Sequence, residues 1–566
     1  MTRTLTTGRL AVAAAHAGAA LAVHAPELAD PFAAALPAAA DIVGRRLRGA
    51  LVREDIGDAR RREYGQGVRY AYDRVEFPSA GVDDPVDLLP AGDAPGFAAE
   101  LRNAVVNLAI AQARQPPAPA GLPSAAFRPP AAAQAPDPAE EVDPDVAAIA
   151  LERLAVAGHN LHPCGRTRLG WDTTDVLAHD LEAGHTTIGF VAVRDDGHLG
   201  DDVGAALAAG YPQLPAPPPG YRLQPVHPWQ RDVILPARYG GLIRHGALRI
   251  LDTELDAMPT AALRTLLLAP GADRLRRYLK VSLDIQVTSS RRSISVASTR
   301  NGPAVSALLH RLVAEDPDGD RLLLLAETAG AAVPAGSGRD MSAILRTALT
   351  GPLRNRRRAA GELAVPGTAL PAINPATGRT VVADLVTAYA GTPLAWLREY
   401  AALLLPPLLR LTVRGVALEA HLQNCLPTFV AGRPHRLAVR DFAGLRLNLH
   451  RLAATGAEVT LWPGSVVRSD DEDTLRAKLG YTAFQAHLGE LIIRVGESHG
   501  LDEGAAWRAV RETVDETYDG LGADPAARRD HAAFTAPQVP HKALVRMRLG
   551  GDGDTYLPVR NPLHAR

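Results

Sequence analysis

Four side chains suited to metal binding or acid–base chemistry occur together late in the chain: Glu419, His421, Asn424 and Asp441. Glu419 and His421 are two residues apart, so they share one face of an extended segment. His421 and Asn424 are three apart, so they can converge at a turn or a helix start. Mg²⁺ takes oxygen ligands, commonly one or two carboxylates together with substrate phosphates. The spacing therefore indicates either an Mg²⁺ site or a hydrogen-bonded polar cluster inside a core.

A second polar group lies in the loop from 158 to 170, which holds His159, His162, Arg166 and Arg168. Histidines three residues apart can bind a metal. Here no third ligand of matching type lies nearby in the sequence, and the arginines would repel a cation. Protonatable imidazoles and guanidiniums favour an anion, such as a phosphate or a carboxylate. The alternative is a solvated basic loop.

A third group combines one lysine with consecutive hydroxyls and arginines: Lys280, Thr288, Ser289, Ser290, Arg291 and Arg292. Hydroxyl and backbone N–H donors at a turn can hold a phosphate while arginine neutralises its charge. The chain has neither of the usual glycine-rich nucleotide loops. A serine- and threonine-rich hairpin without a ligand is the alternative. Together the three groups predict one site, with basic surfaces for a triphosphate and an anionic substrate and an acidic surface for Mg²⁺.

Three segments must position these groups. The apolar run from Ala401 to Val416 predicts a buried helix followed by the start of a strand, and it leads to Glu419. Leu437 to Asp441 predicts a strand that delivers an aspartate at its end. Tyr278 to Val296 alternates well enough for two strands, with five apolar residues on one face: Leu279, Val281, Leu283, Ile285 and Val287.

Periodicity and composition divide the chain into three regions, for which we expect an α+β fold. Residues 1–145 form a helical region that ends in a Pro/Ala-rich linker at 115–145. Residues 146–375 are β-rich, and residues 376–566 are mostly helical. A chain of 566 residues is long enough for two or three domains.

Composition argues against several classes of protein. A net charge of −1 gives no electrostatic reason to expect nucleic acid or an anionic membrane as a partner. No unbroken apolar window reaches about eighteen residues, so no transmembrane span is expected. The two cysteines, Cys164 and Cys425, are expected to be small buried hydrophobes. Because Arg9 to Val23 is only weakly hydrophobic, it predicts an amphipathic helix rather than a signal peptide, and we expect a cytoplasmic protein.

Lysine occurs only at Lys280, Lys478 and Lys542, and every other basic residue apart from histidine is arginine. Because arginine is so abundant, its number alone carries little information. The rarity of lysine makes each of the three positions informative.

The motifs also occur in a characteristic order between about 150 and 450: Gly158-His159-x-x-His162-Pro163, His227-Pro228-Trp229-Gln230, Lys280-x-Ser282-Leu283 leading to Thr288-Ser289-x-x-Arg292, Asn301-Gly302-Pro303, Glu419-x-His421-x-x-Asn424, and Arg440-Asp441. In this order they resemble the NRPS-independent siderophore synthetases, the aerobactin-synthetase-like family. The C-terminal segment from Lys542 to Leu549 and Asn561-Pro562-Leu563 is similar to the end of that family's chains.

The resemblance implies a three-part cupped architecture, described as thumb, fingers and palm, with ATP and a polycarboxylate meeting between fingers and palm. It implies that a carboxylate of citrate or a related acid becomes an acyl-adenylate, which an amine, hydroxylamine or alcohol then captures. It also suggests a homodimer. Apolar helix surface at 401–411 and 488–495 is consistent with such an interface, and the alternative is that these helices simply form the core of the C-terminal region.

The resemblance also implies roles for individual residues. Glu419 and Asp441 would hold Mg²⁺, and His421 would face the nucleotide and the reacting carboxylate. Contacts to ATP would come from the basic, hydroxyl and amide side chains: His159, His162, Arg166, Arg168, Lys280, Thr288, Ser289, Ser290, Arg292 and Asn424. Among these, Ser290 and Arg292 would act with His421 at the reacting centre.

The chain departs from the family pattern at two positions. Arg166 stands where lysine is common, and Ala304 stands where a basic residue often follows Gly-Pro. Arg300 or Arg311 could compensate for Ala304, and we expect Arg311 to contact the acid.

Two other functions compete with this interpretation. His421-x-x-Asn424 followed by Asp441-Phe442-x-Gly444 loosely echoes a kinase catalytic loop and its Mg²⁺-binding motif. The catalytic aspartate that follows a His-Arg pair in kinases is missing here, as is a glycine-rich loop. The third possibility is a binding protein for ATP or a carboxylate that catalyses no reaction.

Overall fold

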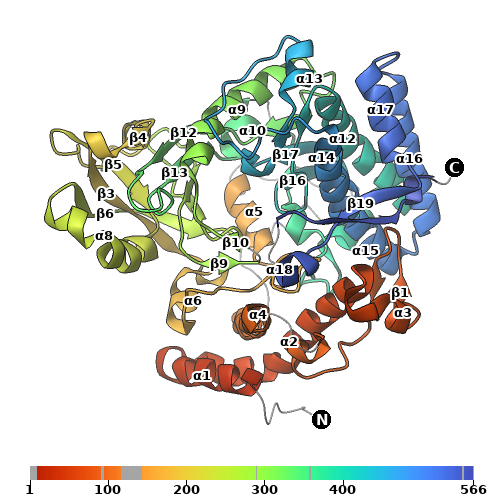
Figure 1. Cartoon of the computed structure of the whole chain (residues 1–566), viewed down its shortest axis with the longest axis horizontal. Coiled ribbons are helices and arrows are strands. Elements are labelled where there is room, and N and C mark those ends of the chain that lie inside the picture. Colours follow the sequence, from red (N-terminus) through yellow and green to blue (C-terminus); the bar gives the residue numbers. More distant parts are fainter. Residues whose placement is uncertain are drawn as a thin grey trace.

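The computed structural model describes residues 9–90, 95–115, 143–288, 290–355, 358–550 and 553–564. It combines helices with a curled antiparallel sheet, so the predicted α+β class is confirmed. The N-terminal helices form one part, the large sheet a second and the C-terminal helices a third (Figure 1). The predicted linker at 115–145 lies almost entirely outside the described residues. The three domain boundaries stay a prediction.

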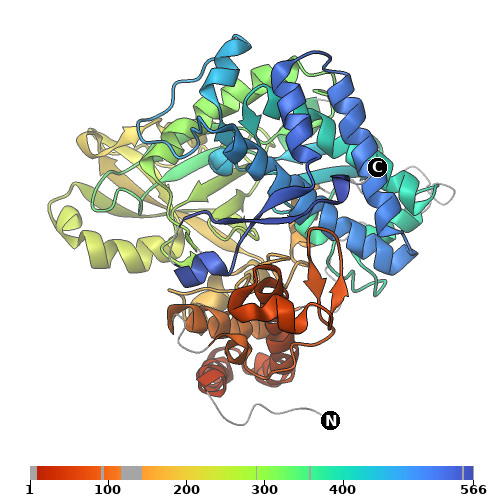
Figure 2. The ribbon, with the colours of Figure 1, turned by 45° about the vertical axis from the view of Figure 1, so that its right-hand side comes forward.

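The N-terminal part is a layer of helices with one short hairpin: α1 (Arg9–His24), α2 (Ala29–Arg53), α3 (Ala59–Glu63), α4 (Pro95–Ala113), β1 (Val68–Arg69) and β2 (Val75–Glu76). Helix α1 is the predicted amphipathic helix and buries Leu10, Ala14, Ala17 and Leu21, which recur every three or four residues. The core of this layer also takes in Val545 from the far end of the chain. Near that end, the β19–β20 hairpin (Gln538–Lys542 and Tyr556–Arg560) runs above the N-terminal helices (Figure 2).

The large sheet has eight antiparallel strands in the order β4-β12-β13-β8-β7-β6-β3-β5. Its strands are β3 (Thr186–Arg194), β4 (Leu199–Gly200), β5 (Tyr221–Val226), β6 (Leu248–Pro259), β7 (Thr265–Leu268), β8 (Arg277–Val281), β12 (Glu327–Ala332) and β13 (Ala343–Thr347). Helices of this region are α5 (Pro144–Glu152), α6 (Thr173–His179), α7 (Val203–Ala208), α8 (Leu235–Arg244) and α10 (Thr350–Asn355).

The five apolar residues predicted to share one strand face are all buried, but in two different cores. Leu279 and Val281 on β8 pack in the core of the large sheet. Leu283, Ile285 and Val287 join the core of the N-terminal helices. After β8 the chain leaves the large sheet and forms a separate hairpin of β9 (Gln286–Val287) and β10 (Ser290–Arg291). The β9–β10 hairpin is therefore joined by the chain to the large sheet and is packed against the N-terminal helices.

One long helix lies inside the region 146–375 that the sequence analysis described as β-rich. Helix α9 (Val296–Ala314) has 19 residues and lies beside β12. Ser295 caps its start, since its hydroxyl accepts a hydrogen bond from the backbone N–H of Ser298. Gly302 and Pro303 lie inside the helix although both residue types commonly interrupt helices. Their presence concealed the helix in the sequence.

The C-terminal part surrounds a four-stranded sheet with the order β11-β17-β16-β14. The strands are β11 (Leu322–Leu324), β14 (Leu363–Ala364), β16 (Cys425–Val430) and β17 (Arg433–Val439), with a separate pair of β15 (Val416–Ala417) and β18 (Arg446–Leu447). The helices are α11 (Val381–Ala388), α12 (Pro393–Val413), α13 (Leu449–Ala454), α14 (Glu472–Leu479), α15 (Gly489–His499), α16 (Glu503–Asp519), α17 (Pro525–Phe534) and α18 (Arg546–Gly550). A π-helical segment, Gly480–Leu488, joins α14 to α15.

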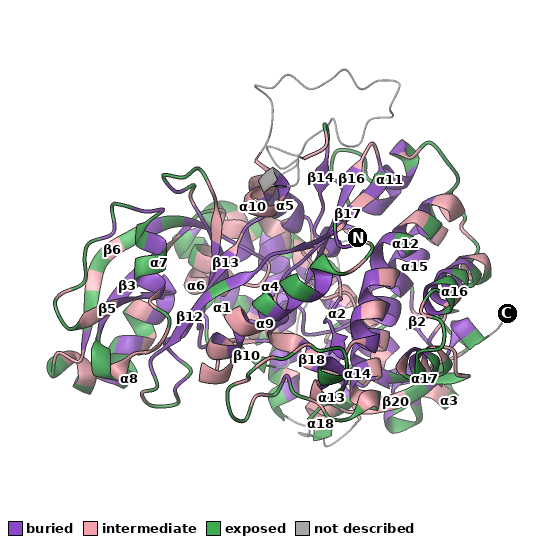
Figure 3. Ribbon diagram, turned by 90° about the horizontal axis from the view of Figure 1, so that it is seen from above, coloured by how far each residue is buried: buried purple, intermediate pink, exposed green. Residues whose placement is uncertain are grey.

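The apolar surface that we connected with a dimer interface belongs to the interior of this part. Leu403, Leu404, Leu408 and Leu411 of α12 are buried, and so are Leu491 and Ile492 of α15. Figure 3 shows these helices largely in the colour of buried residues. They form the core of the C-terminal part, so the physical argument for a dimer was wrong.

The prediction of two buried cysteines is confirmed. Cys164 and Cys425 are both buried and free. Among the described residues, no helix has the length and apolar character needed to cross a membrane.

Candidate active site

Asp441 lies just past the end of β17, as the sequence predicted, in a left-handed backbone conformation with φ 67°. Its Oδ1 accepts a hydrogen bond from Lys280 Nζ at 2.5 Å, and Arg346 Nη2 lies 3.8 Å away. Lys280 and Arg346 come from the neighbouring strands β8 and β13. Burial alone would raise the pKa of Asp441, but Lys280, Arg346 and Arg264 outweigh it and hold that pKa well below its usual range.

Glu419 forms the second acidic position, on the loop that follows β15. Its Oε1 lies 3.0 Å from Lys478 Nζ, and its Oε2 lies 3.9 Å from His421 Nε2. Burial raises the pKa of Glu419, while Lys478 and His421 lower it, and the balance is a pKa of about 2. The carboxylate rests against Gly444, three residues beyond Asp441. Both carboxylates are therefore ionised at neutral pH, and each is fixed in position by its lysine.

His421 and Asn424 complete this loop. Asn424 donates from Nδ2 to the backbone carbonyl of Glu419 at 3.0 Å, so it holds the turn that presents Glu419. Burial lowers the pKa of His421, with partial opposition from Glu419. His421 is therefore a neutral base at pH 7, beside a carboxylate that can stabilise its protonated form.

The imidazoles of His159 and His162, which the sequence analysis described as protonatable, have lowered pKa values and are neutral at neutral pH. His159 Nδ1 accepts from the backbone N–H of Leu161 and of His162, and His162 Nδ1 accepts from that of Cys164. Burial lowers the pKa of His162 to about 3 and that of His159 well below its usual value. Because Nδ1 accepts, each neutral ring carries its proton on Nε2. Nε2 of His162 is buried without a partner among the described residues, so it can donate to an anion.

Arg166 and Arg168 are committed to a buried ion-pair network. Arg166 Nη2 lies 2.9 Å from Glu182 Oε2, and Arg168 Nε lies 2.8 Å from Asp180 Oδ2. Asp180 is fully buried between them. We therefore assign the two arginines to holding the loop rather than to direct contact with ATP.

Arg292 is the best-placed cation for an anionic ligand. Its Nη2 donates to Thr288 Oγ1 at 3.3 Å, while its Nε is buried without a partner among the described residues. Burial and the nearby Arg264 and Arg168 lower the pKa of Arg292 to about 9, against the attraction of Asp441 and Glu419. An anion bound here would offset the free-energy cost of burying the charged guanidinium and would reduce its repulsion with the neighbouring arginines.

The other hydroxyls of this hairpin have different surroundings. Thr288 takes a positive φ of 55° at the turn, and its hydroxyl donates to the carbonyl of Val287 at 2.6 Å. Ser290 is exposed on β10. Ser289 lies outside the described residues.

Arg311 does not lie with the other site residues. It is exposed near the end of α9, where it donates to the carbonyl of Glu458 at 2.9 Å. Ten residues of helix, or about 15 Å, separate it from Asn301 at the pocket. The expectation that Arg311 contacts the acid was wrong. Arg300, the other candidate, lies on the same helix over the ring of Trp462.

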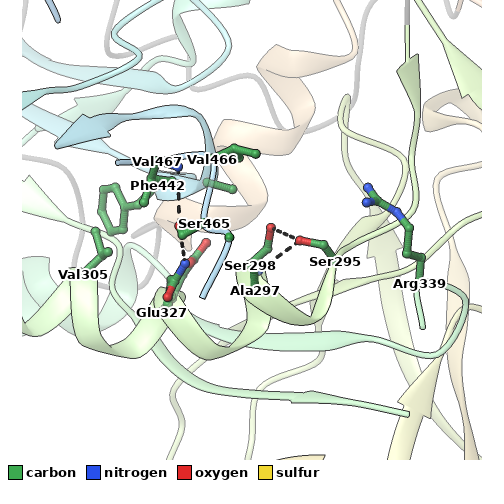
Figure 4. A pocket seen from close by; sticks show the side chains of 14 residues that line it. Ser295, Ala297, Ser298, Val305, Glu327, Arg339, Phe442, Ser465, Val466 and Val467 are labelled. Atoms are coloured by element: carbon green, nitrogen blue, oxygen red, sulfur yellow. Dashed lines mark hydrogen bonds between the residues drawn. The ribbon is translucent and has the colours of Figure 1, made fainter. Parts of the chain in front are cut away.

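A pocket of about 160 Å³ lies beside Phe442, the residue after Asp441, between α9 and the loop that joins α13 to α14. Phe442 and Glu327 line one side and Arg339 the other (Figure 4). Asn301 Nδ2 donates to Ser465 Oγ at 2.7 Å at its edge. Asn301 and Gly302 of the sequence motif therefore form part of the pocket wall.

Five charged residues at or near the site did not emerge from sequence reasoning as site residues: Arg264, Glu327, Arg339, Arg346 and Lys478. Glu327 pairs with Arg346 at 3.0 Å in the interior. Arg264 donates from Nη1 to the carbonyls of Arg292 and Ser293, at 3.1 Å each. Only Lys478 carried a signal in the sequence, since lysine is so rare in this chain.

The donor set fits Mg²⁺ bound together with phosphates. In the described part of the chain, no three histidine, cysteine or acidic side chains form a ready metal cage. Mg²⁺ commonly needs only one or two carboxylates when phosphates and water supply its other ligands. Glu419 and Asp441 provide two ionised carboxylates, each paired with a lysine that a cation would displace.

Comparison with known families matches two segments that contribute to this site. A sequence model described as the IucA / IucC family matches residues 147–372. A second, described as "Ferric iron reductase FhuF-like transporter", matches residues 394–557. The first segment carries Lys280 and Arg292, and the second carries Glu419 and Asp441. Residues 147–372 match the IucA / IucC family. One curated relative, of Aspergillus thermomutatus, is named an NRPS-independent siderophore synthetase-like protein and is 28% identical over 436 residues, which cover 73% of this chain and 68% of that protein. Both findings agree with the resemblance of the motifs.

Two curated relatives are named as synthetic enzymes. The D-ornithine–citrate ligase of Staphylococcus aureus (strain NCTC 8325 / PS 47) is 25% identical over 375 residues, which cover 61% of this chain and 57% of that enzyme. The staphyloferrin A synthase of the same organism is 24% identical over 444 residues, which cover 73% of this chain and 72% of that enzyme.

Two solved structures share the fold. The petrobactin biosynthesis protein AsbB from Bacillus anthracis str. Sterne has a TM-score of 0.75 and 18% identity, over 99% of this chain and 98% of that chain. The ATP-bound aerobactin synthetase IucA from a hypervirulent pathotype of Klebsiella pneumoniae has a TM-score of 0.67 and 19% identity, over 88% of this chain and 92% of that chain. The fold implied by the motifs is confirmed, and the comparisons do not favour the kinase-like alternative.

Proposed function

We propose that this protein is an ATP-dependent siderophore synthetase. It adenylates a carboxylate of citrate or a related acid and then joins that carboxylate to an amine, a hydroxylamine or an alcohol. One observation carries the proposal: two ionised carboxylates, each paired with a lysine, lie within electrostatic reach of the buried Arg292. The curated names of the relatives, a citrate ligase and a siderophore synthase, support the class of reaction.

The reaction needs two transfers. In the first, a carboxylate oxygen of the acid attacks the α-phosphorus of ATP, the bond to the bridging oxygen breaks, and pyrophosphate leaves with the electron pair. In the second, the amine nitrogen attacks the acyl carbon, the C–O bond to AMP breaks, AMP leaves, and the nitrogen loses a proton. Both transfers depend on positioning and on stabilising negative charge rather than on a covalent link to the protein.

The chain supplies groups for each requirement. Arg292 and the Nε2–H of His162 face negative charge on the phosphates, and Lys280 and Arg264 add positive charge beside Asp441. His421, a neutral base beside Glu419, takes the proton from the attacking amine. Mg²⁺ would be held by Glu419 and Asp441, and when bound it supplies Lewis-acid stabilisation of the phosphate charge. Thr288 and Ser290 extend the phosphate contacts along the hairpin.

The test is a product assay with ATP, Mg²⁺, hydroxylamine and a panel of acids: citrate, a citrate monoamide and simple dicarboxylates. The proposal expects release of pyrophosphate that depends on the acid, together with a hydroxamate. Asp441→Asn, in the same assay, controls for contaminating activity. ADP as the only nucleotide product, or no acid-dependent pyrophosphate with any member of the panel, would contradict the proposal.

We also propose that the protein works in the cytoplasm, where ATP and the acid are available, and that it forms a homodimer. The dimer rests on the family resemblance alone, because the apolar helices cited for it are internal. Light scattering at micromolar concentration tests it. A mass near 59.8 kDa would mean a monomer.

A further inference from the structure

A second and much larger cavity lies where the N-terminal helices meet the C-terminal part. Its volume is about 740 Å³, within the range of ligand pockets. Arg46 and Arg53 of α2 form part of one wall, and Glu490 and Arg494 of α15 form part of another. Neither the two proposed Mg²⁺ ligands nor Arg292 belongs to its described lining. The cavity is therefore distinct from the phosphate site.

One loop connects the two sites. Gly158, Asn160 and Leu161 line the cavity. His159, between them in the sequence, lies close enough to His421 and Lys542 for their charges to lower its pKa, which burial lowers most. The loop at 158–161 therefore borders the cavity and also carries His159, which lies near His421.

Arg53 is a buried cation that forms no ion pair within the described chain, although Glu54 and Glu76 are near enough for their charges to raise its pKa. Only 8% of the residue is exposed, its Nε has no partner among the described residues, and its Nη1 lies 3.5 Å from His541 Nε2. No carboxylate of the described chain lies within ion-pair distance of it. Burial and the nearby Arg74 lower the pKa of Arg53 to about 10. A buried charge without a partner costs free energy, which an anionic ligand would recover.

Arg46 also lines the cavity, two helical turns before Arg53 on helix α2. Its Nη1 donates to the carbonyl of Ala157 at 2.6 Å, and it too has no carboxylate partner in the described chain. Burial lowers its pKa to about 10, against the attraction of Glu490. Two guanidiniums on one helix face thus border the same cavity. Guanidiniums so placed match the geometry of a carboxylate.

Three acidic residues of the cavity lining, Glu76, Glu490 and Glu497, are paired with arginines, whereas Glu54 accepts hydrogen bonds from the backbone N–H groups of Val545 and Arg546. Glu490 accepts from Arg74 at 2.6 Å, from Arg494 at 2.8 Å and from Asn160 at 3.0 Å. Glu76 accepts from Arg494 at 2.7 Å. A simple polyamine would have to compete with these arginines for the carboxylates, whereas an anion meets two guanidiniums, Arg46 and Arg53, that form no ion pair within the described chain. The cavity therefore favours a ligand that carries negative charge.

We propose that this cavity binds the acceptor substrate, and that the acceptor is an amine that also carries a carboxylate, held by Arg46 and Arg53. The inference rests on the proposed function, which requires an acceptor. The acid that is activated must meet the phosphates at Arg292 and Asp441, outside the cavity. The acceptor can instead bind in this separate cavity, with its amine directed toward the reacting centre across the loop at 158–163. An amino acid with a second amine has the required chemistry.

The test compares acceptors that differ only by a carboxylate: ornithine with putrescine, lysine with cadaverine, and 2,3-diaminopropionate with ethylenediamine. Each pair is assayed for amide formation with an acid that supports pyrophosphate release. We expect the amino acid to exceed its diamine in kcat/KM by at least about tenfold, because a desolvated charge pair is worth about 1.4 kcal/mol or more. Arg46→Gln and Arg53→Gln should reduce that ratio about tenfold, and Arg53→Lys should retain part of it.

The ratio is measured within each variant, so a general loss of activity cancels. Arg61→Gln, an exposed arginine of α3, should leave the ratio unchanged. If Arg53→Gln does not fold, the partly exposed Arg46 decides the question. Diamines used as well as the amino acids by the wild type, or ratios unchanged in Arg46→Gln, would overturn the inference. Absence of pyrophosphate release from the wild type with hydroxylamine would instead refute the proposed function.

Discussion

Lys280 Nζ lies 2.5 Å from Asp441 Oδ1, and this contact joins residues 161 positions apart in the chain. Lys280 is 1% exposed, so the pair is formed inside the protein. Lys478 makes the equivalent contact with Glu419. Two of the three lysines of the chain thus hold the two proposed Mg²⁺ ligands. Each carboxylate is kept ionised before any cation binds, and each lysine can turn to the phosphates when one does.

The first prediction concerns the charge at Asp441. Asp441→Asn keeps the shape of the side chain but removes a proposed metal ligand and the counter-charge of Lys280. We expect kcat to fall by about 100-fold or more, or about 2.7 kcal/mol in the transition state. Steady-state pyrophosphate release measures this. Circular dichroism should show a folded protein. Near-normal turnover would mean that Asp441 has a structural role only. Asp256→Asn, on an exposed strand position, serves as the matched control.

The second prediction uses the close contact between Gly444 and Glu419. A Cβ at residue 444 would lie 1.9 Å from Glu419 Oε2 and 2.6 Å from its Cδ. Gly444→Ala must therefore displace the carboxylate, and we expect kcat/KM to fall about tenfold or more with little change in Tm. Gly241→Ala is the control, because a Cβ there meets nothing within 4 Å. Full activity in Gly444→Ala would show that the position of Glu419 is unimportant.

The third prediction is that Arg292→Lys is not a conservative change. Arginine can bind two phosphate or carboxylate oxygens with its planar fork, and it also contacts Thr288, whereas lysine is a point charge. We expect turnover to fall by about tenfold, equivalent to about 1.4 kcal/mol. Single-turnover assays with saturating ATP separate this loss from weaker binding. Unchanged kinetics would place Arg292 outside the transition state.

The fourth prediction concerns stability at mildly acidic pH. Burial lowers the pKa of His162 to about 3 and that of His487 to about 4, from 6.5. The unfolded chain therefore binds more protons than the folded chain below pH 6.5, and stability is lost as pH falls. The slope is up to about 1.4 kcal/mol per pH unit for each group. Glu419, with a pKa lowered to about 2, adds a loss only below its ordinary value of 4.5.

Urea denaturation at pH 7.5 and pH 5.5 measures this effect. The free energy of unfolding should be lower at pH 5.5, and His162→Gln should narrow the difference between the two values. His185→Gln, at a largely exposed position, should leave the difference as in the wild type. Equal free energies of unfolding of the wild type at pH 7.5 and pH 5.5 would contradict the conclusion that the buried histidines are neutral in the folded protein.

The sequence predicted the parts of the site that depend on short spacing. Glu419 and His421 are close because they are two residues apart, and Asp441 follows a strand because its apolar neighbours alternate. The residues missed come from long-range pairing. Arg346 reaches Asp441 only because β13 lies beside β8 in a register that no local pattern reveals. Lys478 comes from α14, 59 residues beyond Glu419.

Errors in the prediction have similar physical causes. Helix α9 contains Gly302 and Pro303, which read as breaks, although tertiary packing against β12 stabilises the helix. Arg311 was offered as a compensation for the missing basic residue at Ala304, but the helix carries it away from Asn301. The apolar helices attributed to a dimer are covered by other helices of the same chain, since apolar sequence alone does not say which surface covers it.

The most direct test of the central claim is the fate of a carboxylate oxygen. With the acid labelled by ¹⁸O in its carboxylates, adenylation followed by capture leaves one labelled oxygen in AMP, because the acid oxygen bonded to the α-phosphorus departs with it. The account predicts one ¹⁸O in AMP per amide or hydroxamate formed and unlabelled pyrophosphate. Label in inorganic phosphate together with ADP would show transfer of the γ-phosphoryl group instead, and would contradict the account.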